Sequence, residues 1–215
     1  MTPFTQLTAP ACPLVRSNVD TDQLIPARFM KEPRRVGYGQ FLLYDLRHDD
    51  TGKPADDFIL NQPGAEHFQI MVARRNFGAG SSREAAVYAL VDYGFRCVIA
   101  PSFGDIFSSN AVNNGLLPAL VNEADADRLL NALGSEPTPI SVDLASQQIH
   151  FAGQVIPFDI NAVWKTKLLN GWDDIDLTEG YRSKIDDFLL TYQTRYPWTQ
   201  GQPEGAPGLI ARDNR

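Results

Sequence analysis

Hydrophobic and polar positions alternate along the middle of the chain in a pattern that predicts strands and helices in turn. Apolar runs at residues 69–73 and 96–100 enclose residues 82–93, where small and apolar side chains recur at the spacing of a helix face. The order strand, helix, strand predicts parallel strands with a right-handed crossover. A glycine- and serine-rich turn, NFGAGSSRE at residues 76–84, joins the first strand to the helix, and Gly94 is placed to end that helix.

The same periodicity predicts further elements downstream. They are a helix at 102–113, a strand at 116–121, a helix at 123–133 that Gly134 ends, three antiparallel strands at 140–144, 148–151 and 155–158, and a helix at 161–170. The segment from 174 to about 192 is predicted to open with a turn and become a C-terminal helix. Pro118 predicts an edge or a bulge for its strand. The pattern therefore indicates an α/β fold in which a parallel central sheet, built on βαβ units, accompanies a smaller antiparallel sheet.

The N-terminal part is less regular. Residues 13–16 predict a short strand, and the segment NVDTDQLIP follows at residues 18–26. Asn and Asp side chains bond nearby backbone groups, so this segment is typical of a capped turn that leads to a buried Leu24. The alternative is that Asp20, Thr21 and Asp22 face a functional site, and the sequence leaves both interpretations open.

Residues 28–64 are rich in glycine and proline, and only residues 40–46 predict a short helix. Long irregular segments in a compact domain are usually functional loops or disordered. Basic side chains stand out in this segment, and they are either solvated surface or part of a loop that closes over an acidic substrate. The basic residues are Arg28, Lys31, Arg34 and Arg35.

Composition narrows the possible partners. The chain has 215 residues, 43% of them hydrophobic, and a net charge of −7, which disfavours nucleic acid because a phosphate backbone requires a basic face. No stretch approaches the roughly 18 apolar residues of a membrane span, and no signal-peptide pattern is present, so we expect a cytoplasmic protein without a membrane partner. The length predicts one domain over residues 1–198, with an irregular lobe at 28–64, and a mobile tail at 199–215.

Cysteine and histidine positions argue against a metal site in this chain. Cys12 and Cys97 lie far apart, and Cys97 falls within an apolar strand pattern that predicts a core position. The three histidines, His48, His67 and His150, are scattered without metal-ligand spacing. We therefore expect this chain to bind no metal or cofactor of its own.

The glycine–serine turn is the strongest candidate for chemistry. It leaves the carboxyl end of a predicted parallel strand, as does the loop at 101–104, and ligand crevices form at that edge of an α/β sheet. Glycines permit close approach of the backbone, and a helix start attracts an anion. A dinucleotide fingerprint is disfavoured because Arg83 replaces its third glycine, and a P-loop is excluded because no Gly-Lys-Ser/Thr is present. A simple capping box from Ser81 to Glu84 remains possible.

Several motifs in register closely resemble one family. NFGAGSSRE is followed by DYGF at 92–95, IAPSF at 99–103, DIF at 105–107 and NGLLP at 114–118, a series that resembles the small subunits of bacterial 3-isopropylmalate dehydratases. These are swivel domains of the aconitase superfamily, and NVDTDQLIP looks like their N-terminal motif. The resemblance covers about residues 13–192 and implies a swivelling three-layer β/β/α domain.

The resemblance also implies a reaction and a division of labour. Such enzymes interconvert 2-isopropylmalate and 3-isopropylmalate through a dehydrated alkene in leucine biosynthesis. A [4Fe-4S] cluster is held by cysteines of the large subunit, so this chain would act only in a heterodimer or larger complex on a small dicarboxylate. The motif positions imply that Ser81 is the base, that Ser82 and Arg83 bind a substrate carboxylate, that Lys31 lies in the specificity loop, and that Asp20, Thr21 and Asp22 shape the cleft.

The chain departs from the family pattern at two positions. Small subunits of this family usually read GCGSSREH, whereas Ala79 replaces the cysteine and Ala85 the histidine here. The serines and the arginine are retained, so the chemistry is expected to be retained. The alternatives are a related hydro-lyase acting on methylmalate/citraconate or homocitrate/homoaconitate, or a module that binds an anion without catalysis.

Overall fold

A computed structural model describes residues 1–133 and 138–200. The chain divides into two compact units, Met1–Asp174 and Ile175–Arg215. The single domain predicted over residues 1–198 stays a prediction, and all but the first two residues of its predicted tail lie outside the described residues. The predicted helix stop at Gly134 also lies outside them.

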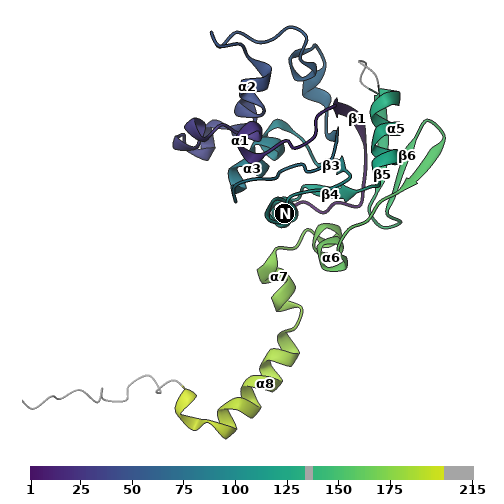
Figure 1. Ribbon diagram of the computed structural model, residues 1–215. Helices are drawn as coiled ribbons and strands as arrows, with labels where there is room; N and C mark the ends of the chain where they lie inside the picture. The colour runs from purple at the N-terminus through teal and green to yellow at the C-terminus, as the bar shows by residue number, and fades with distance from the viewer. Residues whose placement is uncertain (134–137, 201–215) are drawn as a thin grey trace, which may run out of the picture. The chain divides into compact units, whose positions relative to one another are not determined.

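The first unit is built on one mixed sheet (Figure 1). Its strands are β1 Gln6–Leu14, β2 Ile70–Ala73, β3 Cys97–Ala100, β4 Leu117–Leu120, β5 Thr138–Asp143, β6 Gln148–Phe151 and β7 Gln154–Pro157. The order is β4-β3-β2-β1-β5-β6-β7, parallel from β4 to β1 and antiparallel from β1 to β7. The expected separate antiparallel sheet is therefore wrong, because β1 joins both groups into one seven-stranded sheet. The parallel core and the edge position of β4, which contains Pro118, are confirmed.

Strand β1 makes this connection by pairing differently along its two halves. Residues from Gln6 to Ala11 pair antiparallel with β5, and residues from Ala11 to Leu14 pair parallel with β2. Each half has a paired neighbour mainly on one side, which is the edge-like setting where prolines such as Pro10 and Pro13 are tolerated. The strand predicted at residues 13–16 is thus longer and earlier than expected.

Both faces of the parallel strands are buried, as expected for strands between helices. On β2, Met71 and Ala73 contribute to one core cluster, and Ile70 and Val72 to another. The first cluster contains apolar residues of α3 (Glu84–Tyr93), and the second contains those of α5 (Glu123–Leu133). The remaining helices of this unit are α1 Thr21–Leu24, α2 Tyr44–Arg47, α4 Asp105–Asn113 and α6 Ala162–Asn170.

The segment at residues 28–64 is a series of short turns rather than one loop. Its 3₁₀ helices are Ala27–Lys31, Arg34–Val36, Tyr38–Phe41 and Ile59–Asn61, and a further one, Ala65–His67, follows the segment directly. The helix predicted at residues 40–46 is wrong, because Leu43 has a φ of +52° and separates a 3₁₀ turn from α2. Gly39 lies against the end of α3, where an added Cβ would be 2.6 Å from the backbone nitrogen of Tyr93. This contact packs the irregular segment onto the core.

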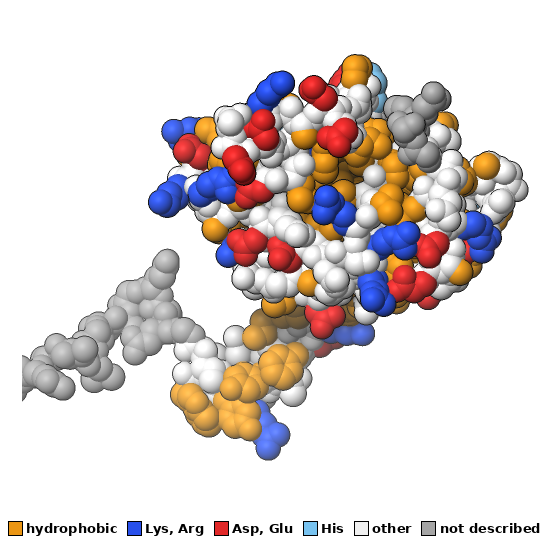
Figure 2. Space-filling model, turned by 45° about the horizontal axis from the view of Figure 1, so that its top comes forward, with side chains coloured by type: hydrophobic (Ala, Val, Ile, Leu, Met, Phe, Trp, Pro, Cys, Tyr) orange, Lys and Arg blue, Asp and Glu red, His pale blue; other side chains and the backbone are white. Residues whose placement is uncertain are grey.

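The second unit contains α8 (Arg182–Arg195) and a 3₁₀ turn, Pro197–Thr199, and α7 (Asp174–Glu179) leads into it. The segment from residue 174, predicted to open with a turn and become a helix, instead opens with α7, and the C-terminal helix α8 begins at Arg182 after Gly180. Phe188, Leu190 and Trp198 are 62%, 71% and 77% exposed, and Figure 2 shows hydrophobic side chains at the surface of this unit. Within residues 1–133 and 138–200, no helix combines the length and the apolar character of a transmembrane span.

Candidate active site

The glycine–serine turn lies directly beside the loop that follows β3. The N–H of Phe77 donates to the carbonyl of Ser102 at 3.0 Å, and the N–H of Gly104 donates to the carbonyl of Phe77 at 2.9 Å. Phe77 and Phe103 form a parallel bridge. The prediction that both loops meet at the carboxyl edge of the parallel strands is therefore confirmed.

Gly78 permits this close approach. It has a φ of +72°, and an added Cβ would lie 2.2 Å from Cγ of Phe107 on α4. Its N–H donates to the carbonyl of Val19 at 2.7 Å, which ties the turn to the segment before α1. A side chain at this position would be strained and would push α4 away from the turn.

The segment at residues 20–22 forms the capped turn, which is one of the two interpretations that the sequence left open. Asp20 caps α1, with its carboxylate accepting from the N–H of Gln23 at 2.7 Å and the Gln23 side chain accepting from the N–H of Asp20 at 3.3 Å. Thr21, only 2% exposed, donates its N–H to the carbonyl of Ala79 at 2.9 Å and its hydroxyl to the carbonyl of Ser81 at 3.0 Å. The capped turn is confirmed, and the same turn holds the glycine–serine loop.

A cavity of about 210 Å³ lies between this loop and the first turn of α4. Its lining residues are Thr21, Gly78, Ala79, Gly80, Ser81, Arg83, Gly104, Asp105, Ile106 and Phe107. Neither α3 nor α4 has a side-chain hydrogen bond at its N-cap. Backbone N–H groups at helix starts bind anions, so the wall formed by the start of α4 suits a carboxylate, apart from the acidic Asp105.

Helix α3 begins later than predicted, which changes the role of the serines. Arg83 occupies the N-cap without a side-chain cap, so the predicted capping box from Ser81 to Glu84 is wrong. The carboxylate of Glu84 instead accepts from the side-chain amide of Asn114 at 2.9 Å. Ser81 and Ser82 are exposed and belong to the turn itself, where their hydroxyls are not used to cap α3.

Arg83 carries positive charge to the cavity wall. Its Nη1 donates to Oδ1 of Asp22, and its side chain is 22% exposed. A guanidinium has five N–H donors in a planar fork, so this ion pair orients the group and leaves capacity for a second carboxylate. Asp22 therefore contacts the cavity wall through Arg83, although neither Asp22 nor Asp20 lines the cavity.

The structure does not bring every predicted residue to the cavity wall. Ser82 is exposed in the turn but does not line the cavity. Lys31 is exposed at the end of the 3₁₀ helix Ala27–Lys31, and it does not line the cavity either. Arg28 pairs with Asp45, and the Arg28 hydrogen bond holds the pKa of the Asp45 carboxyl below its usual value. Part of the basic set is therefore engaged in surface ion pairs.

The start of α4 contributes residues that sequence reasoning did not assign to the site. Asp105, Ile106 and Phe107 line the cavity from the side opposite the glycine–serine turn. The sequence pattern that could have indicated these residues is the helix start after the second parallel strand, which lies at the same edge of the sheet as the glycine–serine turn. The sequence predicts that helix at Ser102, but it begins after Gly104, and the Ser102 hydroxyl instead accepts from the N–H of Asn76 at 2.8 Å.

The cysteines belong to the core. Cys12 and Cys97 are fully buried in different core clusters, and burial raises the pKa of both thiols. Among the described residues, no group of three or more His, Cys, Asp or Glu side chains is arranged to hold a metal ion. Cys12 and Cys97, buried in separate core clusters, do not form the set of thiolate ligands that an iron–sulfur cluster requires.

Comparisons with known proteins agree with this architecture. A family model described as the aconitase C-terminal domain matches residues 1–124. The chain is 47% identical over 204 residues to a 3-isopropylmalate dehydratase small subunit of Rhodospirillum centenum, covering 94% of this chain and 100% of the relative. It is 47% identical over 187 residues to another from Brevibacillus brevis, covering 86% and 96%. A crystal structure of 3-isopropylmalate dehydratase from Methanocaldococcus jannaschii matches with a TM-score of 0.60 at 24% identity, covering 85% of this chain and 98% of that chain, which shows a shared fold.

Proposed function

The chain belongs to the family of 3-isopropylmalate dehydratase small subunits, and on that premise we propose that its cavity is one half of a hydro-lyase active site. The reaction is the interconversion of 2-isopropylmalate and 3-isopropylmalate in leucine biosynthesis. The other half belongs to a large subunit that carries the [4Fe-4S] cluster. When bound there, the cluster supplies Lewis-acid chemistry for the departing hydroxyl group.

One observation carries this proposal: Ser81 and Arg83 line the same cavity, opposite the start of α4. The Arg83 guanidinium binds one substrate carboxylate, and backbone N–H groups at the start of α4 add to the binding of negative charge. Ser81 Oγ accepts the proton from the carbon next to a carboxylate while the C–H bond breaks. A serine hydroxyl is a weak base, and a nearby guanidinium with fixed dipoles stabilises its alkoxide and the developing anion.

The remaining site residues have supporting roles in this proposal. Ser82, in the exposed turn, donates its hydroxyl to a substrate carboxylate, and Lys31 contributes to the recognition of the substrate's variable group from the irregular segment. Asp20 and Thr21 hold the turn, and Asp22 orients Arg83. They act on the geometry of the turn and of its arginine.

The size of the cavity agrees with a shared site. At about 210 Å³ it is smaller than the roughly 300–1,000 Å³ of pockets that enclose drug-sized ligands. It accommodates a carboxylate and the adjacent carbon atoms, and it leaves the rest of the substrate to be covered from outside. A large subunit seated over the opening supplies that cover.

The two departures from the family pattern leave the proposed chemistry in place. Ala79 lines the cavity, but the contact that it makes with Thr21 uses its backbone carbonyl. Ala85 packs against the first core cluster from α3. Neither side chain is required for the roles proposed for Ser81 and Arg83.

Reconstitution tests the proposal directly. The chain is mixed with a cognate large subunit whose cluster is intact, and alkene absorbance is followed with 3-isopropylmalate, methylmalate and homocitrate as substrates. We expect turnover with 3-isopropylmalate. Absence of turnover with that substrate, or a preference for another acid, contradicts the proposal.

Substitution of the base supplies the residue-level test. Ser81→Ala should lower kcat by roughly 10²–10⁴-fold, because the proton acceptor is lost, while substrate affinity is retained. Ser109→Ala, an exposed serine on α4 outside the cavity lining, is the matched control and should behave as wild type. Unchanged turnover of Ser81→Ala would show that this serine is not the base.

A further inference from the structure

A second hollow lies on the other side of the first turn of α4. It has a volume of about 400 Å³, and its apolar lining comes from Pro101, Phe103, Pro118, Leu120, Ile160 and Trp164. We call it the α4–α6 pocket, because α4 and α6 contribute residues to its wall. None of the roles proposed above uses this pocket.

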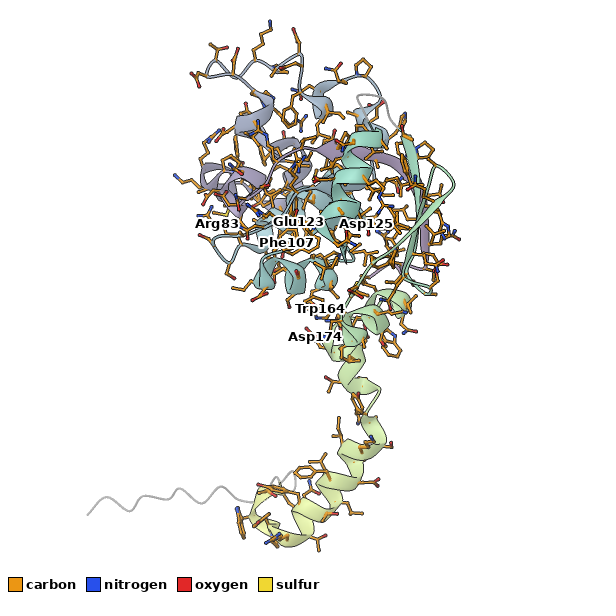
Figure 3. The ribbon with its side chains drawn as sticks, turned by 45° about the vertical axis from the view of Figure 1, so that its right-hand side comes forward. Arg83, Phe107, Glu123, Asp125, Trp164 and Asp174 are labelled. Atoms are coloured by element: carbon orange, nitrogen blue, oxygen red, sulfur yellow. The ribbon has the colours of Figure 1, made fainter. Side chains whose placement is uncertain are left out.

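The α4–α6 pocket and the active-site cavity occupy the same edge of the sheet. Pro101 follows the carboxyl end of β3, and Leu120 ends β4. Asp105 lines both hollows, so the start of α4 is the wall between them. A helix with its side chains is about 10–12 Å wide, so the two openings are roughly one helix diameter apart. In the view of Figure 3, Phe107 of the cavity lies between Arg83 and Trp164 of the α4–α6 pocket.

Large apolar side chains remain exposed around this pocket. Leu120 in its lining is 38% exposed, Ile106 on the dividing turn is 52% exposed, and Val163 beside Trp164 is 50% exposed. Exposed apolar side chains that gather around one hollow are typical of protein interaction sites. The backbone below it is fixed, since Leu120 and Asp159 exchange N–H···O=C bonds of 3.1 and 2.7 Å.

We propose that the α4–α6 pocket docks an apolar side chain of the large subunit and anchors the small subunit beside the active site. This inference rests on the proposed function, because it requires a partner seated over the cavity. A specific interface buries about 800 Å² on each partner, equivalent to a disc of about 16 Å radius. A disc of that size centred on the cavity includes a pocket one helix diameter away.

The apolar character of the pocket indicates what it accepts. Binding energy at interfaces concentrates where an aromatic or aliphatic side chain fills a desolvated pocket near the centre. A pocket walled by two prolines, a phenylalanine and a tryptophan meets that description. Polar side chains complete its lining, and the two carboxylates among them, Asp105 and Asp159, disfavour an anionic occupant. The occupant is therefore an aromatic or branched aliphatic side chain on the large-subunit surface that surrounds the cluster.

The test uses Leu120→Lys, which places a charge at the mouth of the pocket without altering the proposed catalytic residues. Affinity for the cluster-loaded large subunit is measured by isothermal titration calorimetry. We expect Kd to rise at least tenfold, and kcat at saturating large subunit to stay within about threefold of wild type. Val155→Lys is the matched control. Val155 is 54% exposed on β7, beside the β6–β7 turn, and its substitution should leave Kd unchanged.

A second variant keeps the test decisive if the lysine variant misfolds. Leu120→Ala only removes apolar contact and adds no charge, and it should raise Kd to a smaller extent. Wild-type Kd for Leu120→Lys or Leu120→Ala overturns the proposal. So does a result in which Leu120→Lys abolishes self-association of the chain, measured by sedimentation, without changing the affinity for the large subunit. A wild-type pair that binds but does not turn over 3-isopropylmalate contradicts the proposed function alone.

Discussion

Thr21, at the start of α1, ties that helix to the glycine–serine turn and also lines the cavity. Its N–H and its hydroxyl reach the carbonyls of Ala79 and Ser81, on either side of Gly80. Gly80 has a φ of +96°, so the turn depends on contacts from outside to keep its shape. Thr21 is therefore a positioning residue that acts on the proposed base through the backbone.

Removal of the Thr21 hydroxyl should disturb the turn without changing the volume of the side chain. Thr21→Val leaves the Ser81 carbonyl without this donor, and a displacement of the base of about 1 Å can lower turnover about 10²-fold. We expect kcat to fall about 10- to 100-fold in the reconstituted enzyme, with a smaller change in KM. Steady-state kinetics of the complex measure both quantities.

Thr21→Ser is the control because it keeps the donor. It should restore kcat to within about threefold of wild type, even if loss of the methyl group lowers thermal stability. A Thr21→Val enzyme with lower stability but normal kcat would show that the hydroxyl is merely structural.

At the scale of elements, the beginnings of helices were harder to predict than their existence. The motif Ser81-x-x-Glu84 satisfies the capping-box pattern, yet α3 begins at Glu84, because the turn is held by Thr21 and by the loop after β3. Those contacts are distant in sequence and do not appear in a local pattern. The box formed instead at Asp20 and Gln23, in a segment where the sequence indicated only a capped turn.

The contact between the turn and α4 gives a prediction about Gly78. Gly78→Ala combines a left-handed backbone with a Cβ that overlaps the Phe107 ring. We expect the free energy of unfolding to fall by about 2–5 kcal/mol, from about 1–2 kcal/mol of backbone strain and about 1–3 kcal/mol of overpacking. Urea denaturation measures this change.

Gly64→Ala separates the two causes. Gly64 also has a left-handed backbone, with a φ of +89°, but an added Cβ would have no heavy atom within 4 Å. This variant should lose only the backbone part, about 1–2 kcal/mol. Equal losses for both variants would mean that the Phe107 contact does not constrain the turn.

The irregular segment contains an acid-sensitive contact between two of its elements. The Arg28 hydrogen bond lowers the pKa of Asp45, so this pair stabilises the segment above the ordinary carboxyl pKa of about 4 and is lost as pH falls through the lower folded-state value. The protection factors for hydrogen exchange of residues 28–48, which remove the intrinsic pH dependence of the exchange rate, should therefore fall below about pH 4. Asp45→Asn should lower these protection factors at neutral pH and show a weaker fall in acid, whereas identical profiles would contradict this assignment.

At the scale of the whole molecule, the sequence predicted the parallel core but not its connection to the antiparallel strands. Strands such as β2 and β3 are buried on both faces, so a local run of apolar residues is enough to predict them. Strand β1 contains Pro10 and Pro13, which argue locally against a central strand. It forms because its two halves pair with β2 and β5. A local sequence pattern does not predict pairing between segments more than fifty residues apart.

The buried cysteines make the stability of the whole fold sensitive to alkaline pH. Burial raises the pKa of the Cys12 and Cys97 thiols, so both stay protonated in the folded chain when the unfolded chain releases their protons. Their contribution to stability is complete below the unfolded pKa of about 8.5 and is lost as pH rises above it. Each thiol should lower the free energy of unfolding by about 1.4 kcal/mol per pH unit between roughly pH 9 and 10.5.

Urea denaturation from pH 8 to 10.5 measures this slope, and a Cys12→Ala, Cys97→Ala variant is the comparison. The variant loses packing at every pH, but its stability should fall less steeply as pH rises. The slopes of the two proteins should differ by up to about 2.7 kcal/mol per pH unit. Below the unfolded thiol pKa, the difference in stability between the two proteins should be constant. Parallel curves across the whole range would mean that the thiols ionise equally in the folded and unfolded chains, which contradicts their complete burial on the two faces of one sheet.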